Sequence, residues 1–125
     1  MAWELNSDRP IYTQILEKIK TLIVCGVYNP GDKLPSVRDL AAQAGVNPNT
    51  MQRAFAELER SELIITQRNS GRIVTSDENL INAIKKEMAQ MQVNDFIENM
   101  KQIGFTNNEI ISIINETLRE GTNIE

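Results

Sequence analysis

The residues that could carry out chemistry in this 125-residue chain are few. It contains no histidine and one cysteine, Cys25. A structural zinc site needs several such ligands and a cysteine nucleophile needs a histidine base, so both are excluded. Carboxylates alone could form a metal or acid–base site, but the acidic residues show no pair that stands out from a solvated helix face. The sequence therefore predicts that the chain is not an enzyme and holds no metal and no cofactor.

A different chemistry is offered by Asn49, Gln52 and Arg53, which lie close together in one segment. Their side chains carry the forked donors and acceptors that recognise adenine and guanine edges in the major groove. Four cations flank this segment along the chain: Lys33, Arg38, Arg68 and Arg72. Cations in flanking positions can bind phosphates and fix the register of a duplex. Together these residues predict a surface for double-stranded DNA.

The overall charge of −4 argues against such a partner only while the chain is taken as a whole. Residues 1–76 carry nine basic and eight acidic side chains, a net charge of +1, whereas residues 77–125 carry four and nine, a net charge of −5. Because a DNA-binding surface needs local rather than total basicity, the first part remains a suitable candidate. The acidity belongs to the tail.

Three helices are predicted to position the polar residues. Isoleucines at helical spacing follow Pro10, and the turn-forming run 29–32 ends this first segment. Ser36 is an N-cap residue for a short second helix, which Gly45 closes. Asn47 and Pro48 then supply the N-cap and the first residue of a third helix. Two short helices joined by a tight glycine-containing turn indicate a helix-turn-helix.

After Leu63 the pattern changes to short β-rich runs. Residues 64–67 and 72–75 flank a loop at 68–71 that contains a glycine, which predicts a β-hairpin. A hairpin directly after a helix-turn-helix is a wing. The predicted fold class is therefore mainly α (α+β): a winged helix-turn-helix DNA-binding domain over residues 1–76, followed by a helical dimerisation region over residues 77–125.

The tail is predicted to be two helices joined at residues 103–106, with Thr106 and Glu109 as a capping box. A 49-residue tail cannot bury so many apolar residues alone, so we expect it to form a homodimer. The alternative is that it packs on its own winged helix, and a methionine stripe could also line a ligand site. The residues expected in the dimer interface are Leu80, Ile84, Met88, Met91, Phe96, Ile97, Met100, Ile110 and Ile114.

The compartment follows from what the chain lacks. No apolar run is long enough to cross a bilayer, and the N-terminus shows no signal-peptide pattern, so no membrane association is expected. A single cysteine fits a reducing, cytoplasmic environment. Because Cys25 lies within the apolar run 22–25, we expect it to be a buried, inert thiol.

Several of these stretches together resemble the GntR family of regulators. They are Pro10-Ile11-Tyr12 with Gln14-Ile15, the run from Pro30 to Ala41, Gly45-Val46-Asn47-Pro48-Asn49-Thr50, Arg53-Ala54-Phe55 and Leu58-Glu59. The resemblance spans about residues 9–75, and the tail resembles the short dimerising region of the YtrA-like subfamily. It implies a bacterial winged helix that acts as a repressor and binds a pseudo-palindromic operator as a dimer. By position, its DNA contacts correspond to Ser36, Arg38, Asn49, Thr50, Gln52, Arg53 and Gly71.

The sequence departs from the family pattern at two places. The family's Glu-Gly-Leu at the end of the third helix is Ser61-Glu62-Leu63, so backbone strain is expected at Glu62. In the wing, a glycine and a threonine of the family pattern are lost and Arg72 is gained. The resemblance therefore supports the DNA contacts of the helices more strongly than those of the wing.

Two other functions are compatible with parts of this pattern. A winged helix can serve protein or RNA contacts, in which case Asn49, Gln52 and Arg53 would be incidental. A GntR-type domain can also be fused to a pyridoxal-phosphate aminotransferase, which needs several hundred more residues and a cofactor lysine. A small-molecule effector is possible, and we expect it between subunits or at the domain junction because the tail is too short to enclose one.

Overall fold

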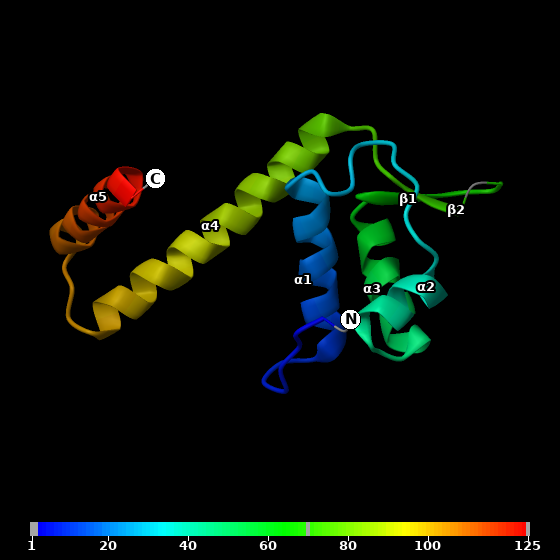
Figure 1. Ribbon diagram of the computed structural model, residues 1–125, viewed down its shortest axis with the longest axis horizontal. Helices are drawn as coiled ribbons and strands as arrows, with labels where there is room; N and C mark the ends of the chain where they lie inside the picture. Colours follow the sequence, from blue (N-terminus) through cyan, green and yellow to red (C-terminus); the bar gives the residue numbers. More distant parts are fainter. Residues whose placement is uncertain (1–2, 70, 125) are drawn as a thin grey trace. The chain divides into compact units, whose positions relative to one another are not determined.

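The computed structural model describes residues 3–69 and 71–124 of the chain. Its residues form two compact units, Met1–Lys85 and Lys86–Glu125. The first consists of three helices, a two-stranded hairpin and the start of a fourth helix. The second contains the rest of that fourth helix and a fifth (Figure 1). The predicted mainly helical winged-helix fold is confirmed.

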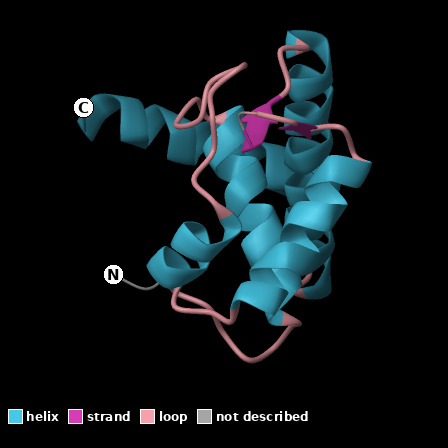
Figure 2. Ribbon diagram, turned by 90° about the vertical axis from the view of Figure 1, so that its right-hand side faces the viewer, coloured by secondary structure: helices cyan, strands magenta, loops and turns pink. Residues whose placement is uncertain are grey.

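The three helices of the first unit are α1 (Ile11–Val24), α2 (Val37–Ala44) and α3 (Pro48–Arg60). Helices α1 and α3 lie side by side, with α2 against α3 (Figures 1 and 2). The two predicted N-cap residues, Ser36 and Asn47, cap their helices as expected. Ser36 Oγ accepts a hydrogen bond from the Asp39 amide at 3.0 Å, and Asn47 Oδ1 accepts one from the Asn49 amide at 2.8 Å. Such caps satisfy amides that the helix itself leaves without a partner.

One contiguous core holds this unit together. Helix α1 contributes Ile15, Ile19 and Ile23, one residue per turn, and α3 contributes its buried stripe around Phe55. The core also includes Ile81, from the fourth helix, and Ile84 packs against it. The unit thus forms its core from a single chain.

The hairpin pairs β1 (Ile64–Gln67) with β2 (Gly71–Val74) in antiparallel register, with Ile64 opposite Val74. The second strand begins one residue earlier than the sequence predicted, and Thr75 follows it as a buried residue outside the strand. The loop before α2 extends the sheet, because the Leu34 amide donates to the Arg72 carbonyl at 2.9 Å and the Val74 amide to the Asp32 carbonyl at 2.8 Å. The wing is therefore fastened to the segment that carries Lys33.

The N-terminal segment is held by a side chain that the sequence did not single out. Gln14 is buried, and its amide group accepts from the Asn6 amide at 2.9 Å and donates to the Asn6 and Arg9 carbonyls at 2.8 and 3.0 Å. Next to it, an ion pair with Glu17 raises the pKa of Arg9. These contacts fix the chain that leads into α1.

The tail consists of α4 (Glu78–Gln102) and α5 (Asn107–Ile124). The predicted capping box is present: the Glu109 carboxylate accepts from the Thr106 amide at 2.9 Å, and Thr106 Oγ1 accepts from the Glu109 amide at 3.3 Å. The bond from the Thr106 amide lowers the pKa of Glu109. No helix in the described part of the chain is long and apolar enough to span a membrane.

The expectation of a buried Cys25 is wrong, because the thiol is exposed. The inward stripe of α1 ends at Ile23, and Cys25 is the residue that closes the helix. Two residues beyond Ile23 correspond to a rotation of about 200°, which turns the side chain away from the core. The apolar run 22–25 therefore did not indicate burial of Cys25, its last residue.

Candidate nucleic-acid interface

The turn between α2 and α3 sets the orientation of the candidate interface. Gly45 closes α2 in the left-handed conformation, with φ of 75°. Its amide and that of Val46 both donate to the Ala41 carbonyl, at 2.9 and 3.0 Å. A side chain at this φ would be strained, so the glycine permits a turn short enough for α3 to begin at Pro48.

Helix α3 has two distinct faces. Met51, Ala54, Phe55 and Leu58 are buried in the core. Asn49, Gln52 and Arg53 lie on the opposite face and are exposed, while Thr50 is half-buried. The three polar side chains predicted to read bases are thus brought together at the N-terminal half of one helix. This is the end of a recognition helix that meets base edges.

Four of the predicted cations accompany this face without an intramolecular acid. Lys33, Arg38, Arg53 and Arg68 form no ion pair with any of the described residues. Lys33 reaches toward the wing, since a side chain at Gly71 would meet its Cε at 4.0 Å. Gly71 itself has φ of 76°, which favours glycine at the turn into β2. These cations therefore keep their charge available for DNA.

Ser36 was predicted as a DNA contact by resemblance, and it also caps α2. Its oxygen accepts the Asp39 amide, but its hydroxyl proton remains a donor. A serine in this position can therefore stabilise the helix and donate to a phosphate at the same time. The two roles do not compete.

Arg72 differs from the other cations of the wing. Its Nε donates to Glu59 Oε1 at 2.7 Å, with both side chains about one-third exposed or less. Its guanidinium carbon also lies 5.3 Å from the centre of the Phe55 ring. The side chain thus joins β2 to α3. Sequence reasoning placed Arg72 in the DNA interface but missed its partner Glu59, which was noted only as part of a motif.

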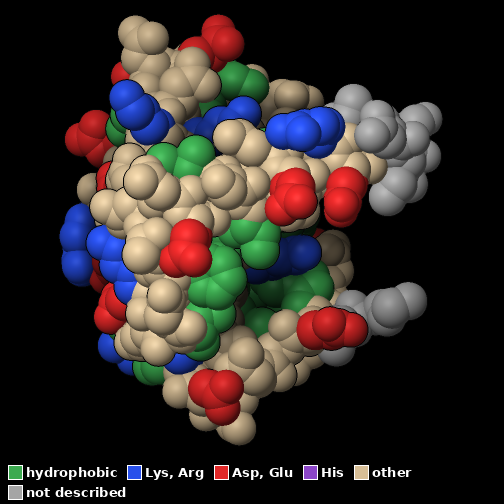
Figure 3. Space-filling view, turned by 90° about the vertical axis from the view of Figure 1, so that its left-hand side faces the viewer, with side chains coloured by type: hydrophobic (Ala, Val, Ile, Leu, Met, Phe, Trp, Pro, Cys, Tyr) green, Lys and Arg blue, Asp and Glu red, His purple; other side chains and the backbone are tan. Residues whose placement is uncertain are grey.

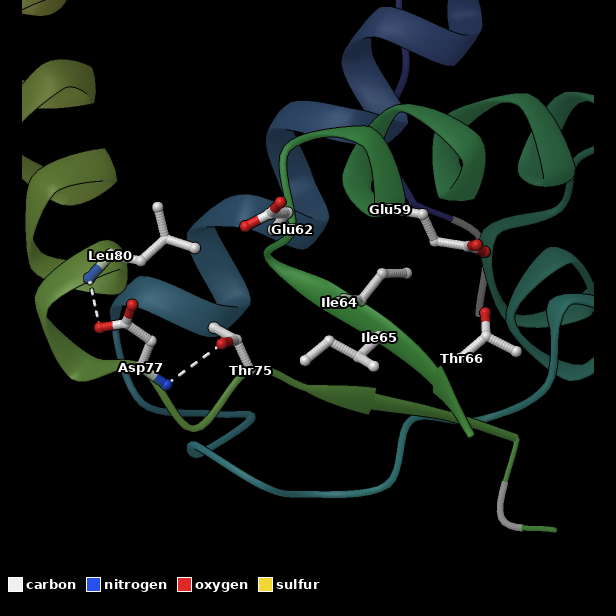
Figure 4. A pocket seen from close by; sticks show the side chains of 8 residues that line it. All are labelled: Glu59, Glu62, Ile64, Ile65, Thr66, Thr75, Asp77 and Leu80. Atoms are coloured by element: carbon white, nitrogen blue, oxygen red, sulfur yellow. Dashed lines mark hydrogen bonds between the residues drawn. The ribbon is translucent and has the colours of Figure 1, made fainter. Parts of the chain in front are cut away.

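A pocket of about 340 Å³ lies between the end of α3, the wing and the start of α4. Figure 4 shows two hydrogen bonds among its lining residues: Thr75 accepts from the Asp77 amide, and Asp77 from the Leu80 amide. Glu59 pairs with Arg72, and Glu62 adds a third carboxylate. Its carboxylates make it unsuitable for a phosphate backbone, so the candidate interface does not extend into it.

The residues predicted to form a dimer interface are found in three situations. Ile84 packs against the core of the first unit, and Ile110 is buried. Met91 and Phe96 are 61% and 40% exposed. The others are half-buried: Leu80, Met88, Ile97, Met100 and Ile114. Hydrophobic side chains are visible at the surface among charged ones (Figure 3).

Sequence reasoning did not assign several further exposed apolar side chains of the tail to the interface. They are Val93, Ile103, Ile111 and Ile113. Phe96 and Met100 of α4 line a groove of about 270 Å³ with α5 residues that include Ile113 and Ile114. This is below the roughly 300 Å³ of a typical small-molecule pocket. The signal for Val93 was available, since it is three residues before Phe96 and seven before Met100.

The tight turn, the exposed polar face of α3 and the hairpin beside it define the class: this is a winged helix-turn-helix DNA-binding protein. Residues 11–74 match the family described as bacterial regulatory proteins, gntR family. The chain belongs to the GntR family of transcriptional regulators.

Relatives and a solved structure agree with this assignment over most of the chain. An uncharacterised HTH-type transcriptional regulator of Bacillus subtilis, YhcF, is 36% identical over 94% of this chain and 97% of its own length. The B. subtilis HTH-type transcriptional repressor YtrA is 40% identical over 69% of this chain and 71% of its own length. A GntR-family regulator from Listeria monocytogenes has a TM-score of 0.84 and 41% identity, covering 90% of this chain and 98% of that one. The predicted family and its YtrA-like resemblance are confirmed.

Proposed function

We propose that this regulator is a cytoplasmic repressor that binds a pseudo-palindromic operator as a homodimer, with α3 of each subunit in the major groove. The observation that carries the proposal is the exposed face of α3. There, Asn49, Gln52 and Arg53 lie together without an acidic partner among the described residues. Repression is supported by the similarity to the repressor YtrA.

The division of roles among the DNA contacts follows from their chemistry. Arginine can donate two hydrogen bonds to a guanine edge, and asparagine or glutamine can pair with adenine. Lys33, Arg38 and Arg68 lie outside α3 and are assigned to phosphates, as are the hydroxyls of Ser36 and Thr50. Arg72 is the least suited of the predicted contacts, since Glu59 already neutralises it.

The homodimer is supported by the tail. The second unit leaves apolar side chains such as Met91, Phe96 and Ile103 at 61%, 40% and 70% exposure. Large apolar side chains exposed on a small helical unit indicate a protein partner. A second copy of the chain supplies an identical surface, and two-fold symmetry then requires two equivalent half-sites in the operator.

The readout is tested by replacing Arg53 and a matched arginine of the same helix. A binding sequence is first selected from a random duplex library, and affinities are measured for that sequence and for random DNA. Arg53→Ala should cost roughly 1–3 kcal/mol on the selected sequence and relax preference at one position per half-site. Arg60→Ala is the control, because Arg60 is exposed at the C-terminal end of α3 and pairs with Glu57 at 2.8 Å. It should change neither affinity.

Arg38→Ala separates base contacts from phosphate contacts. It should weaken all sequences about equally and reduce the salt dependence by roughly one unit of slope per contact. If Arg53→Ala instead weakens selected and random DNA alike, Arg53 does not read a base. If the selection enriches no sequence, the chain is not a sequence-specific regulator, and a protein or RNA partner for the winged helix becomes the better explanation.

A further inference from the structure

A contact between the first turn of α1 and the recognition helix was not anticipated from the sequence. The guanidinium carbon of Arg53 lies 3.7 Å from the centre of the Tyr12 ring. This is the separation of groups in van der Waals contact, well within the range at which a cation is attracted to an aromatic face. Among the described residues, the Arg53 guanidinium has no hydrogen-bond or ion-pair partner, so the ring is its recorded side-chain contact.

The contact lies at the edge of the candidate interface. Tyr12 and Arg53 line a groove of about 360 Å³ between the start of α1 and the N-terminal half of α3, together with Pro10, Ile11, Asn49 and Thr50. Asn49 and Thr50 are both assigned to DNA. The ring is therefore placed beside residues proposed to touch the duplex, and not in the core on the other side of α3.

The chemistry of the pair distinguishes it from an ion pair. A guanidinium is planar, and its five N–H donors point outward in the plane of the group. An aromatic ring occupies the face of the cation and leaves those donors free, whereas a carboxylate would use two of them. Arg72 illustrates the alternative, because its Nε is bound to Glu59 at 2.7 Å. Arg53 is held in place without losing its donors.

We propose that Tyr12 is a positioning residue of the DNA interface, whose ring holds the Arg53 guanidinium so that its N–H donors are presented to one base in each half-site. The inference rests on the proposed function and extends the interface to α1. Holding a long side chain before DNA arrives removes part of the entropy cost of ordering it in the complex. The face of the ring is what matters, and the phenolic hydroxyl is dispensable.

The experiment uses the full-length protein, the selected duplex and a random duplex. Tyr12→Leu removes the ring and should weaken the selected duplex by about threefold to thirtyfold, the range expected for a cation–aromatic contact, while random DNA binds as before. Tyr12→Phe retains the ring and should stay within about twofold of the parent protein. Combined with Arg53→Ala, Tyr12→Leu should cause no further loss, because the group that the ring positions is absent.

Three outcomes would overturn the proposal: equal weakening of selected and random DNA by Tyr12→Leu, a Tyr12→Phe variant as weak as Tyr12→Leu, or additive losses in the double variant. A fold defect in Tyr12→Leu would also weaken both duplexes, so thermal unfolding is measured first, and equal weakening overturns the proposal when the variant unfolds at the temperature of the parent protein. Stacking is measured independently of DNA as the upfield ring-current shift of the Arg53 Hδ protons by NMR. That shift should persist in Tyr12→Phe and disappear in Tyr12→Leu. If the shift is present but no duplex is selected, the proposed function fails while the contact stands.

Discussion

Phe55 and Phe96 are both phenylalanines on helices, yet one is fully buried and the other is 40% exposed. Phe55 lies in α3, within the core of the first unit, and Phe96 lies in the part of α4 that belongs to the second. The first unit obtains its stability from contacts within one chain. The second leaves apolar surface that contributes only when another molecule covers it. We therefore expect folding and the proposed self-association to depend on different parts of the molecule.

The largest effect expected from this contrast is on folding stability. Phe55→Ala should lower the free energy of unfolding of the first unit by about 3–5 kcal/mol, because it removes a fully buried ring and leaves a cavity. Phe96→Ala should lower the free energy of unfolding of the dilute monomer far less. It should instead weaken the proposed self-association. Denaturant titration at low protein concentration and sedimentation measure the two quantities. Equal destabilisation of the monomer by both variants would contradict the contrast.

The second prediction concerns removal of the tail. The cut should follow Lys85 and not residue 76, because Ile81 belongs to the core and Ile84 packs against it. A single half-site should bind on the order of 10 μM, and tethering supplies an effective concentration of about 1 mM, which gives about 0.1 μM for a full palindrome. Residues 1–85 should therefore stay folded, sediment as a monomer and lose about a hundredfold in affinity for the palindrome.

A charge effect opposes this loss and makes the truncation informative. The tail is acidic, so its removal alone would favour DNA. A half-site duplex serves as the control, since residues 1–85 should bind it at least as well as the full chain does. A truncated protein that stays dimeric, or that keeps a large preference for the palindrome, would show that the winged helices pair without the tail.

The pattern of α4 explains why the tail cannot be separated at its first residue. Leu80, Ile84, Met88 and Met91 follow one another at helical spacing, but the next apolar residue, Val93, comes only two positions later. A step of two rotates the stripe by about 200°, so Val93, Phe96 and Met100 occupy nearly the opposite face. Within the first stripe, Ile84 packs against the core of the winged helix. The second stripe lines the groove with α5.

The third prediction compares the two arginines of the wing. Arg72→Ala should lower the free energy of unfolding by about 1 kcal/mol, because it breaks a partly buried ion pair and leaves Glu59 without its partner. Arg68 is exposed and forms no ion pair with the described residues, so Arg68→Ala should change stability by less than about 0.5 kcal/mol. Chemical denaturation measures both. Greater destabilisation by Arg68→Ala would show that the wing is held differently.

The same pair of arginines can be compared on DNA. Arg68→Ala should weaken binding to all sequences and reduce the salt dependence, whereas Arg72→Ala should act on binding mainly through the wing's attachment to α3. Exchanging the two residues, with Glu59→Arg and Arg72→Glu together, restores an ion pair with its charges swapped. It should recover part of the stability that Arg72→Ala loses. A double variant no more stable than Arg72→Ala would indicate that the ion pair is not what attaches the wing.

Local features were predictable from the sequence because their causes are local. The caps at Ser36 and Asn47, the left-handed Gly45 and the capping box at Thr106 each depend on residues within a few positions of one another. The exposed face of α3 followed from helical periodicity alone. The family motif placed these elements in a known order.

Features that depend on distant residues were not predictable in the same way. The contact of Tyr12 with Arg53 joins residues 41 positions apart, and Arg72 finds Glu59 across the turn into the wing. No spacing rule connects such partners. The exposure of Cys25 was missed because an apolar run was taken as a sign of burial without regard to helix phase. Which DNA contacts and which dimer contacts form remains a prediction.

The smallest expected effect is a gain in folding stability, whereas the other substitutions lower stability or binding. It tests the position after α3 where this chain has Glu62 and the family pattern has glycine. Glu62 has φ of 66°, the left-handed conformation that sequence reasoning expected to strain it. A non-glycine residue in this region costs on the order of 1–2 kcal/mol, whereas glycine adopts it freely. Glycine also makes the unfolded chain more flexible, which offsets about 0.4–1 kcal/mol of the gain. Glu62→Gly should therefore raise the free energy of unfolding by roughly 0.5–1 kcal/mol and the melting temperature by about 2–5 °C.

Two matched substitutions isolate the backbone as the cause. Glu62→Ala removes the same carboxylate but keeps a Cβ, so it should give little of the gain if strain, and not charge, is responsible. Ala56→Gly introduces glycine at an exposed position inside α3 and should lower stability by about 0.5–1 kcal/mol. If Glu62→Ala stabilises the protein as much as Glu62→Gly, the gain is electrostatic. It would come from removing the Glu62 carboxylate from among the other carboxylates of the pocket beside the wing. A glycine at 62 that destabilises the protein would mean that the side chain of Glu62 has a role in holding the wing that outweighs its own strain.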